Sequence, residues 1–266
     1  MNTLANLLLS LLLCATPAWA GIDFDGTDDF VDCDSPASLD SFAAFTMAAW
    51  VNIDSLAGDE FAVISKGGGS CVPSCDVKML AVGDWFGNSD RLVVFIHTLA
   101  GNGNSTSANN TMTTGAWTHI AATWAGVDNA AKLYKNGVEV SYANQDAPTG
   151  TIADDSDKEF TIAARDNSGS FNLFFNGRID DVCVWNDDLT ANEVAQLALS
   201  RTRRMCLQVL PSALVLYQPM DDGPDASSAD GDTLDDLSSQ ANNCTGNDGA
   251  GNANLTWTGG QVLSYP

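Results

Sequence analysis

The chain has 266 residues, enough for one large domain or two small ones, and 34 acidic against 11 basic residues give a net charge of −23. Such a charge repels phosphate groups and therefore argues against nucleic acid or an anionic lipid surface as a partner. Glu occurs only at positions 60, 139, 159 and 193, so most of the acidic residues are Asp, which favours turns over helix interiors. The composition predicts many short strands joined by polar loops.

Residues 1–20 have the pattern of a secretory signal. An apolar run from Leu4 to Leu13 leads to Ala18-Trp19-Ala20, a small-x-small cleavage pattern, although the first residues lack Lys and Arg. The run is too short to span a membrane as a helix. The sequence therefore predicts a secreted protein without membrane insertion, whose mature chain begins at Gly21.

From residue 22 onward the pattern is that of short β-strands. Asn136-Gly137 predicts a tight hairpin, because both turn residues tolerate positive φ. The Gly/Asn/Ser/Thr-rich segment 101–114 is predicted to be a low-complexity loop. Apolar or alternating segments bounded by turn residues lie at 22–25, 30–33, 45–53, 61–65, 77–82, 91–97, 117–124, 131–135, 138–140, 160–163 and 177–185.

One short helix is expected after the last main strand. Thr190 and Glu193 form a capping box, and apolar residues recur at helical spacing up to Ser200. The basic segment 201–204 is interpreted as an exposed connector, with a processing site or acid-binding patch as the alternative. Residues 213–217 have the pattern of one more strand, and 221–251 are rich in Asp, Ser, Asn and Gly. That last part is either a loop-rich appendix of the main domain or a flexible tail.

These elements predict an all-β protein, a two-sheet antiparallel jelly-roll β-sandwich. Three segments in this order, 24–31, 115–124 with 133–137, and 175–182, resemble the laminin-G-like (concanavalin A-like) jelly-roll family over residues 21–200. Residues 214–222 resemble a strand that often opens such domains, yet they lie near the C-terminus. The extension 201–266 is therefore expected either to complete the sandwich or to be a truncated second copy.

The resemblance leaves the activity open, because lectins, adhesion modules and polysaccharide hydrolases share this fold. Hydrolases of the family carry paired carboxylates as Glu-x-Asp-x-Glu, which none of the four Glu residues matches, and no Gly-x-Ser-x-Gly elbow occurs. We therefore expect a non-catalytic module that binds a carbohydrate or glycoconjugate or acts in adhesion. A structural surface or virion-type protein is the alternative, and a polysaccharide hydrolase is the less favoured one.

Cysteine usage agrees with export. Of seven Cys, Cys14 lies in the signal, and the six that remain are an even number, as expected of a disulfide framework. Cys71 with Cys75 could instead form half of a zinc site. The resemblance implies that the first and last main strands are neighbours, which suggests Cys33–Cys183, and the other expected pairs are Cys71–Cys75 and Cys206–Cys244.

Aromatic residues in loops are the best candidates for sugar binding, because an exposed ring can pack on the apolar face of a pyranose. Trp85 and Phe86, between Gly-Asp and Gly-Asn pairs, and Phe171, after a Gly-Ser loop, fit this description. The alternative is that these rings cover an edge of the sandwich.

A structural calcium ion is the expected cofactor. The family often holds one at the sandwich rim, and the resemblance brings two Asp clusters together here: Asp23, Asp25 and Asp28 with Asp180 and Asp181. Calcium prefers oxygen ligands, and clustered carboxylates repel one another unless a cation lies between them. Glycosylation sequons occur at positions 104, 109, 243 and 254, and the sequence does not indicate whether they are used.

Overall fold

The protein is described from a computed structural model that covers residues 21–58, 60–67, 76–83, 87, 90–152, 154–167, 169–199, 205–224, 226–249 and 254–258. The predicted signal (residues 1–20), the Cys71–Cys75 pair, the basic segment 201–204 and the aromatic residues Trp85 and Phe86 lie outside the described residues. Within the described residues, no helix has the length and apolar character needed to cross a membrane.

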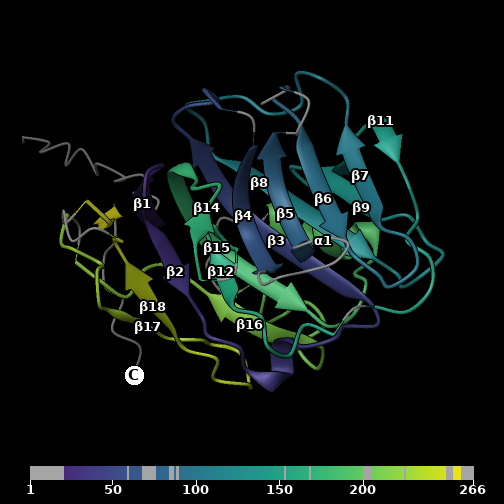
Figure 1. Cartoon of the computed structure of the whole chain (residues 1–266). Helices are drawn as coiled ribbons and strands as arrows, with labels where there is room; N and C mark the ends of the chain where they lie inside the picture. Colours follow the sequence, from purple (N-terminus) through teal and green to yellow (C-terminus); the bar gives the residue numbers. More distant parts are fainter. Residues whose placement is uncertain are drawn as a thin grey trace, which may run out of the picture.

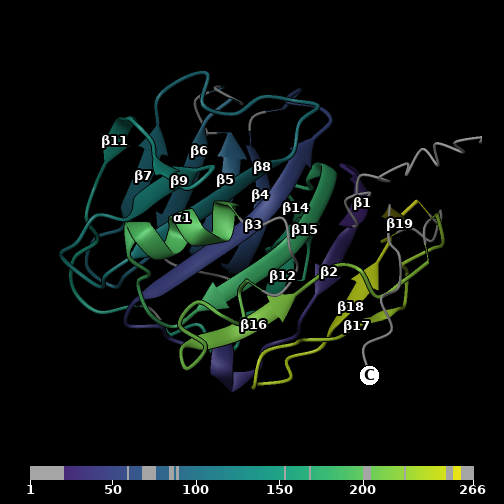
Figure 2. The same ribbon diagram turned by 180° about the vertical axis from the view of Figure 1, so that it is seen from behind.

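The fold is the predicted all-β sandwich of two antiparallel sheets, seen as two layers in Figures 1 and 2. One layer is an eight-stranded sheet among the described residues. Its order is β10 (Val138–Glu139), β9 (Lys132–Lys135), β8 (Thr118–Trp124), β3 (Phe45–Ile53), β15 (Asn176–Trp185), β1 (Gly21–Asp25) and β19 (Thr256–Thr258), and β16 (Leu214–Gln218) also pairs with β15.

The other layer is a nine-stranded sheet among the described residues. Its order is β11 (Tyr142–Gln145), β7 (Gly103–Ser107), β6 (Leu92–Ile96), β5 (Asp76–Gly83), β4 (Glu60–Gly67), β12 (Phe160–Ile162), β2 (Phe30–Asp32), β18 (Cys244–Asn247) and β17 (Thr233–Leu234). A small hairpin, β13 (Arg165–Asp166) with β14 (Phe171–Asn172), follows β12, and a 3-10 turn, η1 (Ala37–Leu39), follows β2.

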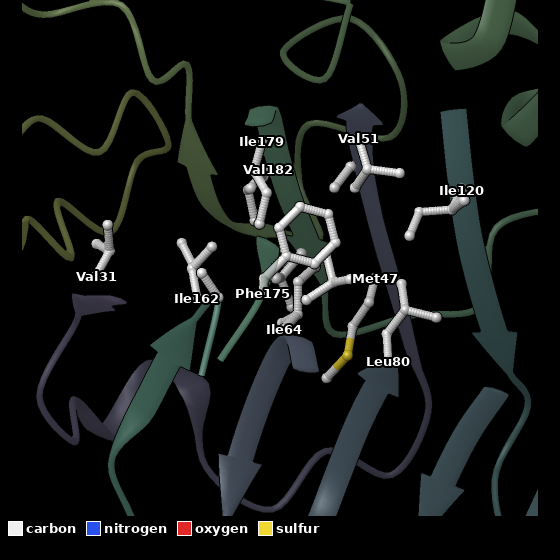
Figure 3. Packing of buried hydrophobic residues seen from close by; sticks show 14 of the residues in the cluster. Val31, Met47, Val51, Ile64, Leu80, Ile120, Ile162, Phe175, Ile179 and Val182 are labelled. Atoms are coloured by element: carbon white, nitrogen blue, oxygen red, sulfur yellow. The ribbon is translucent and has the colours of Figure 1, made fainter. Parts of the chain in front are cut away.

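The core lies between the sheets because apolar side chains alternate along each strand toward the same interior. Figure 3 shows Phe175 amid aliphatic side chains from both layers, with Met47 and Ile179 from one sheet and Ile64 and Ile162 from the other. All of these side chains are essentially inaccessible to solvent. Burial of these apolar side chains between the two sheets is the main source of the stability of the fold.

A second apolar cluster covers the outer face of the eight-stranded sheet. Helix α1 (Ala191–Leu199) lies on this face (Figure 2), with Val194 and Leu197 buried beneath it. The predicted capping box is confirmed: the Thr190 N–H and hydroxyl each donate to a Glu193 carboxylate oxygen at 2.7 Å. The helix therefore begins where the sequence predicts.

The C-terminal extension contributes strands to both sheets. β16 and β19 join the eight-stranded sheet beside β15 and β1, while β18 pairs with β2 in the other layer. Figures 1 and 2 both show β18 next to β2, and Figure 2 shows β19 near β1. Trp257 in β19 is buried, and its indole N–H donates to Asp232 at 2.9 Å. These described parts of the extension are thus part of the sandwich.

Two of the predicted disulfides are wrong. The structure pairs Cys33 with Cys244 and Cys183 with Cys206, in place of Cys33–Cys183 and Cys206–Cys244. Cys33 follows β2 in the nine-stranded sheet, where its neighbour is β18, whereas Cys183 lies in β15 of the opposite sheet and faces the outer apolar cluster. Each disulfide therefore stays on one side of the sandwich and does not join the two sheets. Two disulfides are typical of a protein that folds in an oxidising compartment.

The predicted loop 101–114 is also partly wrong, because β7 occupies residues 103–107 within it. β7 contains no large apolar side chain, and its buried Ser hydroxyls make hydrogen bonds instead. The Ser105 hydroxyl donates to the Ala131 carbonyl at 2.6 Å, and Ser107 accepts from the Leu92 N–H at 2.8 Å. The tertiary context thus outweighs the low strand propensity of this segment. The Asn136-Gly137 hairpin between β9 and β10 is confirmed, with both residues at positive φ.

Candidate functional site

The turn between β1 and β2 gathers three carboxylates at one end of the sandwich. Asp25, Asp28 and Asp29 each place an oxygen atom within 4.8 Å of the others. The turn itself fixes two of them: the Thr27 N–H donates to Asp25 Oδ1 at 2.7 Å, and the Asp25 N–H donates to Asp29 Oδ2 at 2.9 Å. We call Asp25, Asp28, Asp29 and Asn254 the rim cluster.

Residues from the end of the chain complete the rim cluster. The amide of Asn254 donates to Asp25 Oδ2 at 2.6 Å. Gly249 lies so close to Asp28 that a Cβ at this position would be 2.6 Å from the Asp28 Cβ. Asp248, which is buried, adds a further negative charge near Asp29. The cluster therefore depends on the C-terminal extension and not only on the first turn.

The oxygen atoms of the rim cluster fit a divalent cation. The Asp29 side chain is fully buried, and its Oδ1, together with the buried Oδ1 of Asn254, has no hydrogen-bond donor among the described residues. The pKa of Asp29 is raised to about 7, first by burial and then by neighbouring carboxylates that include Asp28. Buried oxygens without donors are costly, and a calcium ion would satisfy them because it takes about 6 to 8 oxygen ligands.

Two of the five predicted metal ligands, Asp25 and Asp28, are brought together in this cluster, and the others are not. Asp23 lies further along β1 opposite Arg178. Asp180 and Asp181 lie at a bulge in β15, where pairing passes from β1 to β16. Because β1 and β15 are antiparallel, Asp180 is beside Gly21, at the other end of β1 from Asp25, about 13 Å along the strand.

Asp23 and Asp181 instead have roles within the eight-stranded sheet. The pKa of Asp23 is raised by burial and by the charge of Asp54, and the guanidinium of Arg178 opposes this shift. Asp181 adopts a positive φ at the bulge and accepts a hydrogen bond from the Tyr217 hydroxyl at 2.8 Å. Asp29 and Asn254 were not among the predicted ligands. The Asp28-Asp29 pair was a local signal for Asp29, whereas only the three-dimensional structure reveals Asn254.

Of the three aromatic candidates, only Phe171 lies in the described part of the chain. Its ring stacks on Phe30 with centroids 4.0 Å apart and planes 23° apart. One face of Phe171 is therefore occupied by packing on β2. Whether Trp85 and Phe86 bind sugar stays a prediction.

A second acidic group lies on the outer face of the nine-stranded sheet. Asp32, Asp34 and Glu159 hold carboxylate oxygens within 4.8 Å of one another. The pKa of Glu159 is raised, first by burial and then by the charges of Asp32 and Asp34. The pKa of Asp32 is also raised, mainly by burial. A proton is therefore held more tightly here than at an ordinary exposed carboxylate.

The main part of the sandwich matches a known family. The profile of the concanavalin A-like lectin/glucanases superfamily matches residues 25–195. The chain belongs to this superfamily. The predicted laminin-G-like resemblance is thus confirmed, and a comparison with curated proteins gives no match.

Among solved structures, the chain resembles a proposed carbohydrate binding protein from Bacteroides ovatus, with a TM-score of 0.62 and 21% identity. That match covers 87% of this chain but only 58% of the Bacteroides chain. It also resembles the carbohydrate-binding module CBM40 of the Ruminococcus gnavus IT-sialidase, with a TM-score of 0.51, 16% identity and coverage of 67% of this chain and 96% of the module. A structure of that module with α2,3 sialyllactose gives a TM-score of 0.50 at 15% identity, covering 66% and 96%. At these identities the likeness establishes a lectin-like fold.

Proposed function

We propose that the protein is a secreted, non-catalytic carbohydrate-binding module whose fold is stabilised by a calcium ion in the rim cluster. The observation that supports the binding activity is the lectin-like sandwich, which spans nearly the full length of a carbohydrate-binding module that is known to hold a sialyllactose. The predicted signal at residues 1–20 and the two disulfides support secretion.

The calcium ion is supported by the oxygen atoms of the rim cluster. Asp25, Asp28 and Asp29 would supply carboxylate ligands, and Asn254 would supply its amide oxygen. When bound, the cation would neutralise the repulsion among these carboxylates and join the first turn to the end of the chain. It would thereby order the rim of the sandwich without taking part in a reaction.

A glycan array with full-length mature protein tests the proposal. We expect retention on a subset of glycans in millimolar calcium, and weaker retention in excess chelator because the rim would loosen. Asp29→Asn should bind weakly in both conditions, whereas Asp128→Asn, on an exposed loop, should behave as wild type. A wild-type protein retained on no glycan would contradict carbohydrate binding and favour the structural surface protein.

A polysaccharide hydrolase is the second candidate, and one observation favours it. Retaining glycosidases use two carboxylates about 5 Å apart, one with a raised pKa, and the Asp32–Asp34–Glu159 group has this spacing and a raised pKa at Glu159. Against it, Asp32 Oδ1 already accepts the Asp34 N–H at 2.9 Å, as in a simple turn. Reducing-sugar release by wild type that Glu159→Gln abolishes would establish hydrolysis; we expect no release from either.

A further inference from the structure

A small polar pocket lies on the outer face of the eight-stranded sheet, beside the start of α1. Figure 2 shows α1 in front of this sheet, close to β9 and β3. The pocket has a volume of about 360 Å³ and is lined from β8, β9, the loop between them and the segment 188–191 that leads into the helix. The residues that matter for its chemistry are Thr123, Asn129, Lys132, Tyr134 and Asp188.

Hydrogen bonds to the backbone hold the walls of the pocket in place. The Thr46 hydroxyl donates to the Asp187 carbonyl at 2.9 Å and accepts from the Leu189 N–H at 2.8 Å. This fixes the segment that leads into α1. On the opposite side, the Trp124 indole donates to the Asn129 carbonyl at 2.9 Å and fixes the loop after β8. The pocket is therefore formed before any ligand arrives, which lowers the entropy lost on binding.

The pocket offers several hydrogen-bonding groups that the described structure does not use. Thr123 and Tyr134 are buried on adjacent strands, and neither hydroxyl makes a hydrogen bond with the described residues. Lys132 and Asp188 are exposed at the mouth of the pocket, where their charged ends remain accessible. The rest of the lining is mostly apolar and comprises Ala125, Ala130, Leu189, Thr190 and Ala191. A convergent polar set beside small apolar walls is the usual composition of a small-molecule site.

We propose that this pocket binds a single uncharged pyranose residue of the glycan. The inference rests on the proposed function and adds the location of the site and the class of sugar. A volume near the lower end of ordinary ligand pockets suits one sugar ring and not an oligosaccharide. The Asp188 carboxylate can accept from two neighbouring sugar hydroxyls, Lys132 and Asn129 can donate, and the alanine methyl groups can contact the C–H face of the ring.

The charge balance selects a neutral sugar. The charges of Lys132 and Asp188 cancel at the mouth of the pocket. The chain as a whole carries a net charge of −23, which repels an anionic ligand. An acidic sugar would gain one favourable contact with Lys132 and meet repulsion from Asp188 and from the surface. The inferred preference therefore differs from the acidic sialyllactose held by the CBM40 module.

Titration calorimetry with monosaccharide probes tests the inference. The probes are methyl glycosides of glucose, galactose, mannose and N-acetylglucosamine, with N-acetylneuraminic acid for comparison. We expect at least one neutral glycoside to bind, with N-acetylneuraminic acid at least tenfold weaker. Asp188→Asn and Ala130→Phe should each weaken the neutral probe at least tenfold, because one removes an acceptor and the other fills the pocket, whereas the control Asp128→Asn should be unchanged.

The same variants on the glycan array separate the two proposals. If wild type binds glycans and both pocket variants bind them equally well, the pocket inference is wrong while carbohydrate binding stands. Stronger binding of N-acetylneuraminic acid than of every neutral probe would overturn the neutral preference. If wild type binds neither the array nor any probe, the proposed function and the pocket inference are both wrong.

Discussion

Cys33 and Cys244 are separated by 211 residues in sequence, yet their Cα atoms lie 4.1 Å apart and a disulfide joins them. The bond links β2 to β18 within the nine-stranded sheet and so ties the first part of the fold to the C-terminal extension. Cys183 and Cys206, by contrast, are only 23 residues apart and close a short loop on the outer face of the other sheet.

The two disulfides should differ in their effect on stability. A chain-entropy model gives about 5 kcal/mol for a loop of 211 residues and about 3 kcal/mol for one of 23. We therefore expect Cys33→Ser with Cys244→Ser to reduce the free energy of unfolding more than Cys183→Ser with Cys206→Ser. Urea titration of both double variants measures this order. Peptide mapping of the non-reduced wild type provides the control, and finding Cys33 bound to Cys183 would contradict the structure.

Calcium should raise the melting temperature. A cation that binds only the folded state, present at a hundred times its dissociation constant, adds about 2.7 kcal/mol, which is about 5 to 10 °C for a chain of this size. Asp29→Asn should remove this shift and should be no less stable than wild type in chelator, because it relieves an uncompensated buried charge. The measurement is calorimetry at pH 7.5 in calcium and in chelator.

Asp181→Asn is the matched control for that experiment. It removes one carboxylate from the same protein, outside the rim cluster, and Asn tolerates the positive φ at this position. Its calcium shift should equal that of wild type. A shift lost in Asp181→Asn and retained in Asp29→Asn would place the ion at the bulge in β15 instead.

Acidification should destabilise the protein through His119. This side chain is buried against Trp50, and burial lowers its pKa to about 3. The unfolded chain takes up the proton below about pH 6.5, whereas the folded protein does so only near pH 3, so stability falls as the pH falls through this window. His119→Phe keeps a ring against Trp50 but cannot take up this proton. When the pH is lowered from 6.5 to 4.5, its free energy of unfolding should therefore fall by about 2 kcal/mol less than that of wild type.

Urea titrations at several pH values, all in chelator, measure this difference. Comparing the two proteins at each pH removes contributions from Asp29 and Glu159, whose raised pKa values act in the opposite direction. Equal slopes of stability against pH in wild type and His119→Phe would show that folding does not lower the pKa of His119.

The contact between Gly223 and Trp257 should be intolerant of added volume. A Cβ at Gly223 would overlap the buried indole ring. We expect Gly223→Ala to cost about 1 to 3 kcal/mol, as overpacking typically does. In the double variant with Trp257→Phe, the smaller ring should relieve the overlap, so that the combined cost is less than the sum of the two single costs. Simple additivity in thermal melts would show that the two residues do not interact.

Local patterns in the sequence predicted most of the fold. The strand at 45–53 coincides with β3, and the hairpin at Asn136-Gly137 and the cap at Thr190 are found where short-range rules place them. β7 was missed because its Ser and Thr side chains are buried through hydrogen bonds to other strands, which no local pattern reveals.

The site was less predictable because its parts come from distant segments. Asp25 and Asp28 are neighbours in one turn and could be grouped from sequence, whereas Asn254 reaches the same turn only through the pairing of β19 with β1. The prediction that Asp180 joins Asp25 and Asp28 in one metal site was wrong for a related reason. Pairing of β15 with β1 was anticipated, but the end of β1 that Asp180 would face depends on the register of that pair.

The position of β1 between β15 and β19 also has a consequence for how the protein is made. β1 is the first described strand, and its two neighbours pair with it through residues 176–179 and 256–258. No partner for this strand exists until most of the polypeptide has been synthesised, so folding cannot proceed stepwise from the N-terminus. Folding dominated by such distant contacts is slow, and until it is complete the unpaired edges of β1 can pair with other chains. A chain that ends at residue 200 would retain β15 but lack β19, so one edge of β1 would stay unpaired and the protein should aggregate.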